Sequence, residues 1–423
     1  MRRYTGTTTP RDQSDVDVKF AIVSDIHGTP SSASSDSYTT TTPPPAPPNQ
    51  HPLEDLIRQA TLNPDLAADA LICCGDMTNR ASPEGTLYVW GRLGILAEAL
   101  GAAVVVASPG NHDLQSRADG GDSRSVLINL IPSYPTRDKD RDSVFWSDGY
   151  TTVESDDYRI VTLNTCLHHT TPDPSMTDEE RKRHNARLER GELEDSTIDS
   201  LVTSVKALAP KPINILVCHH HLIEHEQLDA FSDDYGKVLR GNRLLWELDS
   251  CSAGRWIVVH GHKHIPRLLY SFGSSNAPVV FGAASLGAKL GEKVNTVVRN
   301  QFHLMDCSPT VSSGSTLNAL GTVRSWCWGF GQGWKPAQLE STGLPPVAGF
   351  GYQVAGLDLA AALENELGSS STAIAGWEQI KTAHPDIEYL LPQDLGRLEL
   401  QLEARGIRVQ RHSQGNFSIG RAP

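Results

Sequence analysis

Gly110-Asn111-His112-Asp113 follows the apolar run Val104-Val105-Val106, and this stretch indicates the fold of the chain more directly than any other. A short apolar run that is closed by glycine and polar residues is typical of a strand buried on both faces. The carboxyl ends of such strands are where α/β folds place their sites. The stretch therefore predicts an α/β fold with polar side chains gathered at a strand end.

Four further segments have the same form, with histidine or carboxylate residues after an apolar run. They are Asp25-Ile26-His27, Gly75-Asp76, His219-His220-His221 and Gly261-His262-Lys263-His264, and they follow the runs at 20–23, 70–73, 215–217 and 256–259. We expect all these strand ends to lie on one edge of one sheet. Carboxylate, amide and imidazole ligands without thiolate suit manganese, iron or zinc. Asp76 is the candidate to bridge two cations, because a carboxylate can bind two metals and Gly75 allows close backbone approach.

Each segment also has an ordinary structural interpretation when it is taken alone. Asn111 and Asp113 are residue types that commonly cap turns and helices. His262 and His264 alternate along the chain as surface residues at a strand end would. These interpretations do not explain why all the segments occur together in one order.

Together, the segments resemble the signature of the calcineurin-like metallophosphoesterase family, D-x-H, G-D, G-N-H-[DE], H and G-H-x-H. The resemblance covers residues 18–336. It implies a four-layer α/β/β/α sandwich of two mixed sheets with flanking helices. It also implies two divalent or transition metal ions (Mn, Fe or Zn), one held by Asp25, His27, Asp76 and His264 and the other by Asp76, Asn111, His219 and His262.

The resemblance also implies a reaction. A hydroxide between the metals, with a pKa lowered from about 15.7 towards 7, would attack phosphorus in line. His112 matches the family histidine that assists the leaving oxygen, and Asp113 would orient it. His221 stands where the family commonly has proline, so it is either a substrate phosphate contact or a surface residue.

The style of the motifs is closest to bacterial phosphodiesterases that act on cyclic nucleotides and other small diesters. The implied substrate is therefore a small phosphate ester, nucleotide-like in character. A phosphomonoesterase or protein phosphatase is the alternative enzyme. A nuclease recruited through the C-terminal region is a further alternative. A scaffold that has lost catalysis fits less well, because His112 and every ligand position are retained.

Composition narrows the choice of partners and compartment. The chain has 423 residues and a net charge of -13, with 37 basic and 50 acidic residues, which disfavours a general binder of nucleic acid or anionic membrane. No apolar stretch is long enough to span a bilayer, and the polar start of the sequence leads us to expect no secretory signal. The seven cysteines are an odd number and are expected to be reduced, which favours a cytoplasmic protein.

The polar residues 1–17 predict a flexible tail, and residues 18–336 the catalytic domain. Residues 29–52 form an insertion rich in Pro, Ser and Thr, which is either a flexible loop or a cover over the site. Residues 177–208 begin with a charge run that predicts a solvated helix face. Strands expected at 278–282, 301–306 and 322–328 would form a second sheet packed on the first.

Residues 337–350 are rich in glycine and proline and predict a linker. The remaining residues, 351–423, predict a small C-terminal α+β domain. It would have helices near 357–367 and 393–405 and a hairpin at 407–419. This order suggests a winged-helix-like module, through which a protein partner or nucleic acid could be recruited.

Overall fold

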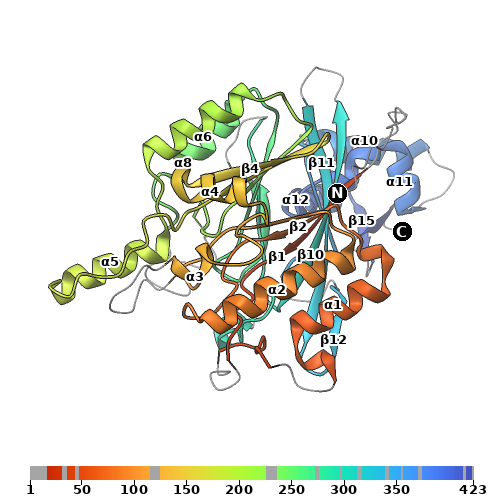
Figure 1. Ribbon diagram of the computed structural model, residues 1–423. Helices are drawn as coiled ribbons and strands as arrows, with labels where there is room; N and C mark the ends of the chain where they lie inside the picture. Colours follow the sequence, from red (N-terminus) through yellow and green to blue (C-terminus); the bar gives the residue numbers. More distant parts are fainter. Residues whose placement is uncertain are drawn as a thin grey trace, which may run out of the picture.

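Two β-sheets packed face to face position the strand ends described above (Figure 1). This computed structural model describes residues 17–30, 36–42, 47–114, 124–224, 236–271, 276–295, 298–311, 317–338, 343–353, 356–369, 374–412 and 416–421. The first sheet has the order β12-β11-β10-β1-β2-β3, with β13 paired to β11. The second has the order β4-β5-β6-β7-β9-β8.

In the first sheet, β1 (Val18–Val23), β2 (Ala70–Cys73) and β3 (Val104–Ala107) are parallel. The chain returns to this sheet late, when β10 (Gln301–Val311) pairs antiparallel with β1. The sheet is extended antiparallel by β11, β12 and β13, which span Leu317–Gly329, Gly333–Pro336 and Val347–Phe350.

In the second sheet, β5 (Tyr158–Leu163), β6 (Ile213–Val217), β7 (Trp256–His260) and β9 (Val279–Gly282) are parallel. The two edge strands, β4 and β8, are antiparallel and span Tyr150–Glu154 and Arg267–Tyr270. The central strands are entirely buried, which explains why they appear in the sequence as continuous apolar runs.

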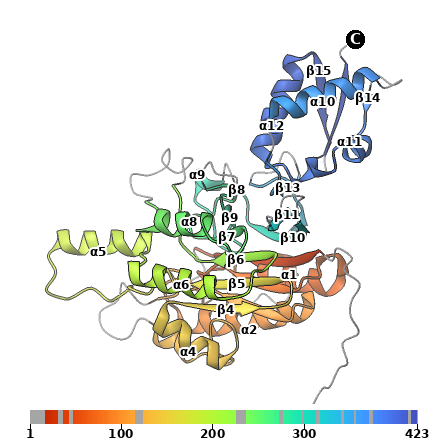
Figure 2. The same cartoon turned by 90° about the horizontal axis from the view of Figure 1, so that it is seen from above.

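Side chains alternate between the two faces of each sheet, and this alternation builds the layers. Phe20 and Ile22 of β1 pack against the second sheet, whereas Ala21 and Val23 pack with the helices α1 (Pro52–Leu62) and α2 (Pro83–Leu100). The other side of the second sheet is covered by α6 (Asp195–Ala207) and α8 (Gly241–Asp249). The predicted four-layer α/β/β/α sandwich is thereby confirmed (Figures 1 and 2).

The assignment of strands to sheets differs from the expectation in one respect. The five motif-bearing strands do not share one sheet, because β1, β2 and β3 lie in the first and β6 and β7 in the second. The late strands β10 and β11 join the first sheet and do not build the second. Strand pairing is decided by long-range packing, and an apolar run carries no record of its partner.

The other described helices of the large domain flank the sheets. They are α3 (Ser125–Ile128), α4 (Lys139–Asp148), α5 (Asp178–Arg190), α9 (Glu292–Asn295) and the 3-10 turns at Pro48–Gln50 and Pro64–Leu66. Helices α3 and α4 contribute Leu127 and Phe145 to the apolar core. Helix α5 starts with a capping box between Thr177 and Glu180, and Leu188 is its one buried residue. It projects from the molecule in Figure 1, so the charge run at its start is a solvated helix face, as predicted.

Part of the 29–52 insertion is described, and it is packed against the domain. The Tyr38 N–H donates to the Gly287 carbonyl at 2.8 Å, and the Ser37 hydroxyl donates to the same oxygen at 3.1 Å. Ser37 and Thr39 are buried. Residues 31–35 and 43–46 of the insertion lie outside the described part of the chain.

A small α+β unit follows the second return to the first sheet, as predicted (Figure 2). Its elements are α10 (Gly356–Ser369), β14 (Ile374–Ala375), α11 (Trp377–Ala383), a 3-10 turn (Pro385–Tyr389), α12 (Pro392–Ala404), β15 (Ile407–Arg411) and β16 (Phe417–Arg421). They share a separate apolar core that includes Leu363, Leu398 and Phe417. The stretch 337–350 was expected to be a linker, but it contains β13, which pairs with β11. Ala348 and Phe350 of this strand are buried between the sheets.

Among the described helices, none combines the length and the apolar character that crossing a bilayer requires.

Candidate metal centre

The carboxyl ends of the motif-bearing strands of both sheets meet at one place. The Asp25 N–H donates to the Gly75 carbonyl at 3.0 Å, which joins the loops after β1 and β2. The Gly261 N–H donates to the His219 carbonyl at 3.0 Å, which joins the loops after β6 and β7. Nδ1 of His219 lies 2.8 Å from the carbonyl of Cys74, so this bond connects the two sheets.

A first group of ligand atoms consists of Asp25, His27 and His264. Nε2 of His264 lies 3.2 Å from Oδ1 of Asp25 and 3.2 Å from Nε2 of His27. The backbone N–H of His262 donates to the Asp25 carboxylate, which fixes its direction. Burial lowers the pKa of His27 to about 3, so its ring is neutral, as a metal ligand must be.

A second group gathers around His219. Its Nε2 lies 3.3 Å from Oδ2 of Asp76 and 3.2 Å from Oδ1 of Asn111. The ring of His262 is 5.1 Å from that of His219, measured between centroids. Nε2 of His262 is buried, and among the residues that the structure describes it has no hydrogen-bond partner. A buried polar atom of this kind is free to bind a metal ion.

Asp76 lies between the two groups. Its Oδ2 is 3.8 Å from Nε2 of His27 and 3.3 Å from Nε2 of His219. Its Oδ1 accepts the backbone N–H of His112 at 2.8 Å, so the carboxylate is held in this direction. One oxygen therefore faces both groups, as a bridging ligand would.

These residues fit a pair of cations, and the environment of His219 shows why. Because Nδ1 donates to the Cys74 carbonyl, the lone pair of a neutral ring at Nε2 would face the oxygens of Asp76 and Asn111. Burial lowers the pKa of His219, but the charge and hydrogen bond of Asp76 outweigh it and raise the pKa to about 9. The Asp76 carboxylate therefore favours a positive charge at this position, which a proton or a metal ion can supply.

The backbone is folded unusually to bring the ligand atoms together. Asp25, His27, Asp76, His262 and His264 all have φ between 50° and 82°, a left-handed conformation that costs a non-glycine residue of order 1–3 kcal/mol. A Cβ atom at Gly110 would lie 2.1 Å from Oδ1 of Asp76, so only glycine fits there. Strain of this kind persists where the surrounding structure enforces it, and here it coincides with the candidate ligands.

His112 borders the groups without belonging to either. It is half-buried, and its ring lies 5.0 Å from that of His27 between centroids. Asp113 was expected to orient this ring, but its carboxylate instead accepts the backbone N–H groups of Gly110 and Thr78, each at 2.9 Å. Nδ1 of His112 faces Oδ1 of Asn79 at 3.2 Å. The Asp113 carboxylate is buried among these backbone groups, and burial raises its pKa to about 7.

Asn79 is a site residue that the sequence reasoning missed. It lies in the loop after β2, and its own N–H donates to the Gly28 carbonyl at 3.1 Å, which fixes it beside the loop after β1. A polar residue three positions after Asp76 was the signal that could have pointed to it.

His221 is fully buried, which excludes the surface alternative. Its ring stacks on that of His262 with centroids 5.8 Å apart and an angle of 20° between the planes. The structure thus packs it against His262 of the second group of ligand atoms.

The family model for calcineurin-like phosphoesterases matches residues 18–290. The chain belongs to this family. Its members are metal-dependent hydrolases of phosphate esters with dinuclear centres, and the gathered His and Asp side chains are the candidate ligands here. A second family model, wHTH-Calcineurin_assc, matches residues 348–404. A search of curated proteins found no match.

Among solved structures, the chain is similar to a dimetal phosphatase from Danio rerio, with 9% identity and a TM-score of 0.46 over 73% of this chain and 95% of that one. It is also similar to purple acid phosphatase PPD1 from yellow lupin (Lupinus luteus) seeds, with 12% identity and a TM-score of 0.46 over 77% and 54% of the two chains. For phosphopantetheinyl hydrolase from Mycobacterium tuberculosis, the identity is 14%, the TM-score 0.34 and the coverage 64% and 90%.

Proposed function

We propose that this protein is a dinuclear phosphodiesterase that hydrolyses a small diester of the cyclic or small nucleotide type. The observation that carries the proposal is the position of Asp76, whose Oδ2 faces the two groups of ligand atoms at 3.8 and 3.3 Å. The proposed ligands of one ion are Asp25, His27, Asp76 and His264. Those of the other are Asp76, Asn111, His219 and His262.

When bound, two metal ions of the Mn, Fe or Zn class supply Lewis acidity and activate a water at neutral pH. The residues of the chain provide the rest. Asn111 contributes a neutral oxygen, which leaves the centre more attractive to an anionic phosphate than a third carboxylate would. Most of the ligand side chains are buried, whereas His112 and His264 are half-buried. The substrate therefore approaches from the side of these two residues.

His112 is the proposed proton donor to the leaving oxygen. Asn79 accepts a hydrogen bond from Nδ1–H, so the ring presents Nε2 to the site. Asp113 acts one step further away, because it holds the backbones of Gly110 and Thr78 and thus the loop that carries His112. His221 is proposed to support His262 and, through it, the phosphate position.

The proposed substrate is a diester, which carries one negative charge, whereas a monoester carries two. A phosphomonoesterase or protein phosphatase remains the alternative, and assays with p-nitrophenyl phosphate and bis-p-nitrophenyl phosphate compare the two directly.

The test of the chemistry is His112→Ala. This variant should keep both metals and bind phosphate-like inhibitors normally, because His112 is not a ligand. It should lose about 10²–10⁴-fold in turnover of diesters with basic leaving groups, the usual contribution of a general acid. The loss should shrink for p-nitrophenolate, which departs without a proton. Equal losses across a leaving-group series would contradict the assigned role, and loss of a metal would contradict the ligand set.

A nuclease recruited through the C-terminal module is less well supported. Residues 351–423 contain six basic and nine acidic residues. Within the described part of the module, Arg397, Arg405 and Arg411 are each paired with a carboxylate, those of Asp394, Glu364 and Glu399.

We assign residues 351–423 to a separate winged-helix-like module and residues 18–336 to the catalytic domain. A protein partner suits the module better than nucleic acid, and a salt titration of DNA binding distinguishes the two.

A cytoplasmic location belongs to the same proposal. All seven cysteines are free thiols, and five of them are buried. This usage is typical of a reducing compartment.

A further inference from the structure

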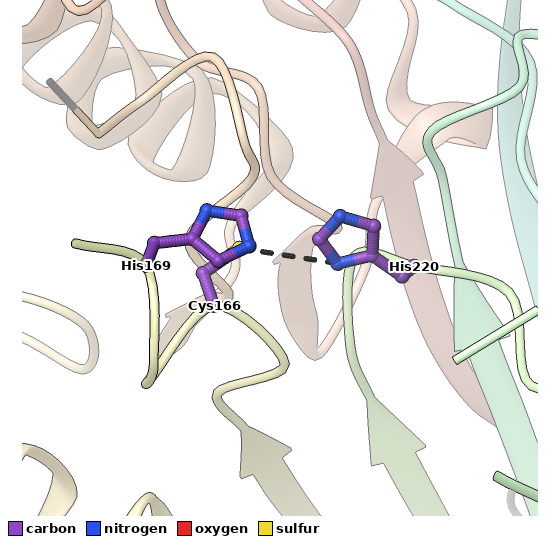
Figure 3. A group of neighbouring side chains, drawn as sticks. All are labelled: Cys166, His169 and His220. Carbon is purple, nitrogen blue, oxygen red and sulfur yellow. Dashed lines mark hydrogen bonds between the residues drawn. The ribbon is translucent and has the colours of Figure 1, made fainter. Parts of the chain in front are cut away.

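A third group of ligand atoms lies beside the two described above, and it differs in chemistry. Cys166 and His169 lie in the loop after β5, and His220 follows the candidate ligand His219 after β6 (Figure 3). One ligand atom of each residue lies within 4.8 Å of those of the other two. All three residues are at least 95% buried. A thiol and two imidazoles thus share one closed space.

The separation between the ligand atoms of Cys166 and His220 is close to that in a tetrahedral zinc site. Sγ of Cys166 lies 3.9 Å from Nδ1 of His220. Bond lengths of about 2.3 Å to sulfur and about 2.05 Å to nitrogen, at a tetrahedral angle, separate the two ligand atoms by roughly 3.6 Å. The group therefore needs an adjustment of a few tenths of an ångström at this edge. The side chains of Cys166, His169 and His220 lie close together in Figure 3.

Existing hydrogen bonds hold the group in place and must be exchanged when an ion binds. The Cys166 thiol donates to the Pro109 carbonyl at 3.3 Å, and the Thr165 hydroxyl lies 2.8 Å from Nδ1 of His220. Ion binding releases the thiol proton to solvent and displaces the Thr165 hydroxyl, which can rotate. Both contacts tie the loop after β5 to its neighbours, so the ligands are oriented before the ion arrives.

We propose that Cys166, His169 and His220 form a third metal site, which takes one zinc-type divalent cation. Thiolate is a soft ligand that selects zinc over the harder manganese and magnesium. Three protein ligands leave a fourth position for water. The site is distinct from the dinuclear pair, because it shares none of the proposed ligands of that pair, although His220 lies beside His219 and His262. Its structural effect follows from its ligands: the ion would fix the loop after β5 to the loop after β6, where His220 follows His219, a proposed ligand of the pair.

The test uses the full chain, freed of metal and titrated with Co²⁺. A cobalt–thiolate bond produces a charge-transfer band in the near ultraviolet that oxygen and imidazole ligands do not. The wild-type protein should show this band, and elemental analysis of zinc-loaded protein should give three ions per chain. Cys166→Ala and His169→Gln should each bind two, and Cys166→Ala should lack the band.

Cys307→Ala is the matched control, because Cys307 is also a buried free thiol but lies in β10. It should keep the band and the third ion. The proposal is overturned if wild-type protein shows no charge-transfer band, or if the band survives Cys166→Ala. The charge-transfer band reports only the sulfur ligand. If the band is present but fewer than three ions are counted, the result contradicts the dinuclear proposal and not the proposed third site.

Discussion

Asp76 combines two properties that set it apart from the other buried carboxylates of the site. Burial raises its pKa, but the nearby rings of His219 and His112 outweigh this and hold the pKa well below its usual range. Its second oxygen is committed to the His112 backbone, so the geometry of the bridge does not depend on a mobile side chain. A neutral amide at this position would keep the shape and remove the charge that two cations share.

We therefore expect Asp76→Asn to lose the second metal ion and most activity while the fold survives. Turnover should fall by more than about 100-fold, since changes to residues that merely support ligands already cost 10–100-fold. Elemental analysis after reconstitution and circular dichroism measure the two effects. Asp195→Asn, at an exposed carboxylate on α6, is the control and should change neither. Full activity of Asp76→Asn with one ion or none would disprove the bridging role.

The sequence predicted the candidate ligands because each directly follows an apolar strand. It did not predict Asn79, whose contact with His112 arises when the loops after β2 and β3 are brought together. Cys166 and His169 were missed for a related reason. Strand β5 was not recognised, so the residues after it were never placed at the same edge as His220. Local patterns indicate strand ends, but the contacts between loops depend on sheet order.

The sequence predicted best those strands whose own residues show that they are buried. The apolar runs of β1, β2, β6 and β7 were found because burial on both faces makes them continuous. The edge strands β4 and β8 were missed because a partly exposed strand mixes polar and apolar residues. Strand β5 is fully buried but was also missed, because Arg159 and Thr162 interrupt its apolar residues. Strand β10 was found but placed in the wrong sheet. Its pairing with β1 joins residues nearly 300 positions apart, which no local pattern encodes.

Strand β10 also carries a buried histidine that links stability to pH. Burial lowers the pKa of His303 to about 3, and its Nδ1 lies 3.0 Å from the Ser325 hydroxyl on β11. The folded protein therefore keeps this ring neutral, whereas the unfolded chain binds a proton below about pH 6.5. Because the unfolded state binds more protons, stability is complete above about pH 6.5 and falls as the pH decreases towards 3.

We expect His303 alone to reduce the free energy of unfolding by about 2 kcal/mol between pH 7.5 and pH 5. His303→Gln should remove this part of the pH dependence, although it lowers stability at neutral pH. Urea denaturation of metal-free protein at the two pH values measures the difference. His412→Gln, at an exposed histidine, should retain the wild-type dependence. An identical slope in wild type and His303→Gln would mean that other groups cause the acid sensitivity.

The two parts of the chain are joined by more than a linker. Strand β13 completes the first sheet, and Phe350 is buried between the sheets together with Leu391, which precedes α12. The next residue, Gly351, is held through its carbonyl by Arg255 at 2.9 Å and through its N–H by the Tyr270 hydroxyl at 3.0 Å. The small module is thus anchored to the second sheet as well as to the first.

Two truncations separate the contribution of β13 from that of the module. A chain ending at Gln353 keeps β13 and its anchors and loses Leu391. It should fold, bind both metals of the pair and hydrolyse small diesters at the full rate, with stability lower by about 2 kcal/mol from the lost burial of one leucine.

A chain ending at Gln338 also loses Phe350 and Ala348, which are buried in the core between the sheets. Removal of the phenylalanine alone costs about 3–5 kcal/mol, and β11 is left with an unpaired edge that favours aggregation. Thermal denaturation, metal content and turnover of bis-p-nitrophenyl phosphate should therefore separate the two truncations clearly. The proposed ligands and His112 all lie before residue 265, so both truncated chains contain them. If the chain ending at Gln353 folds but has lost turnover, the module itself contributes to the catalytic site.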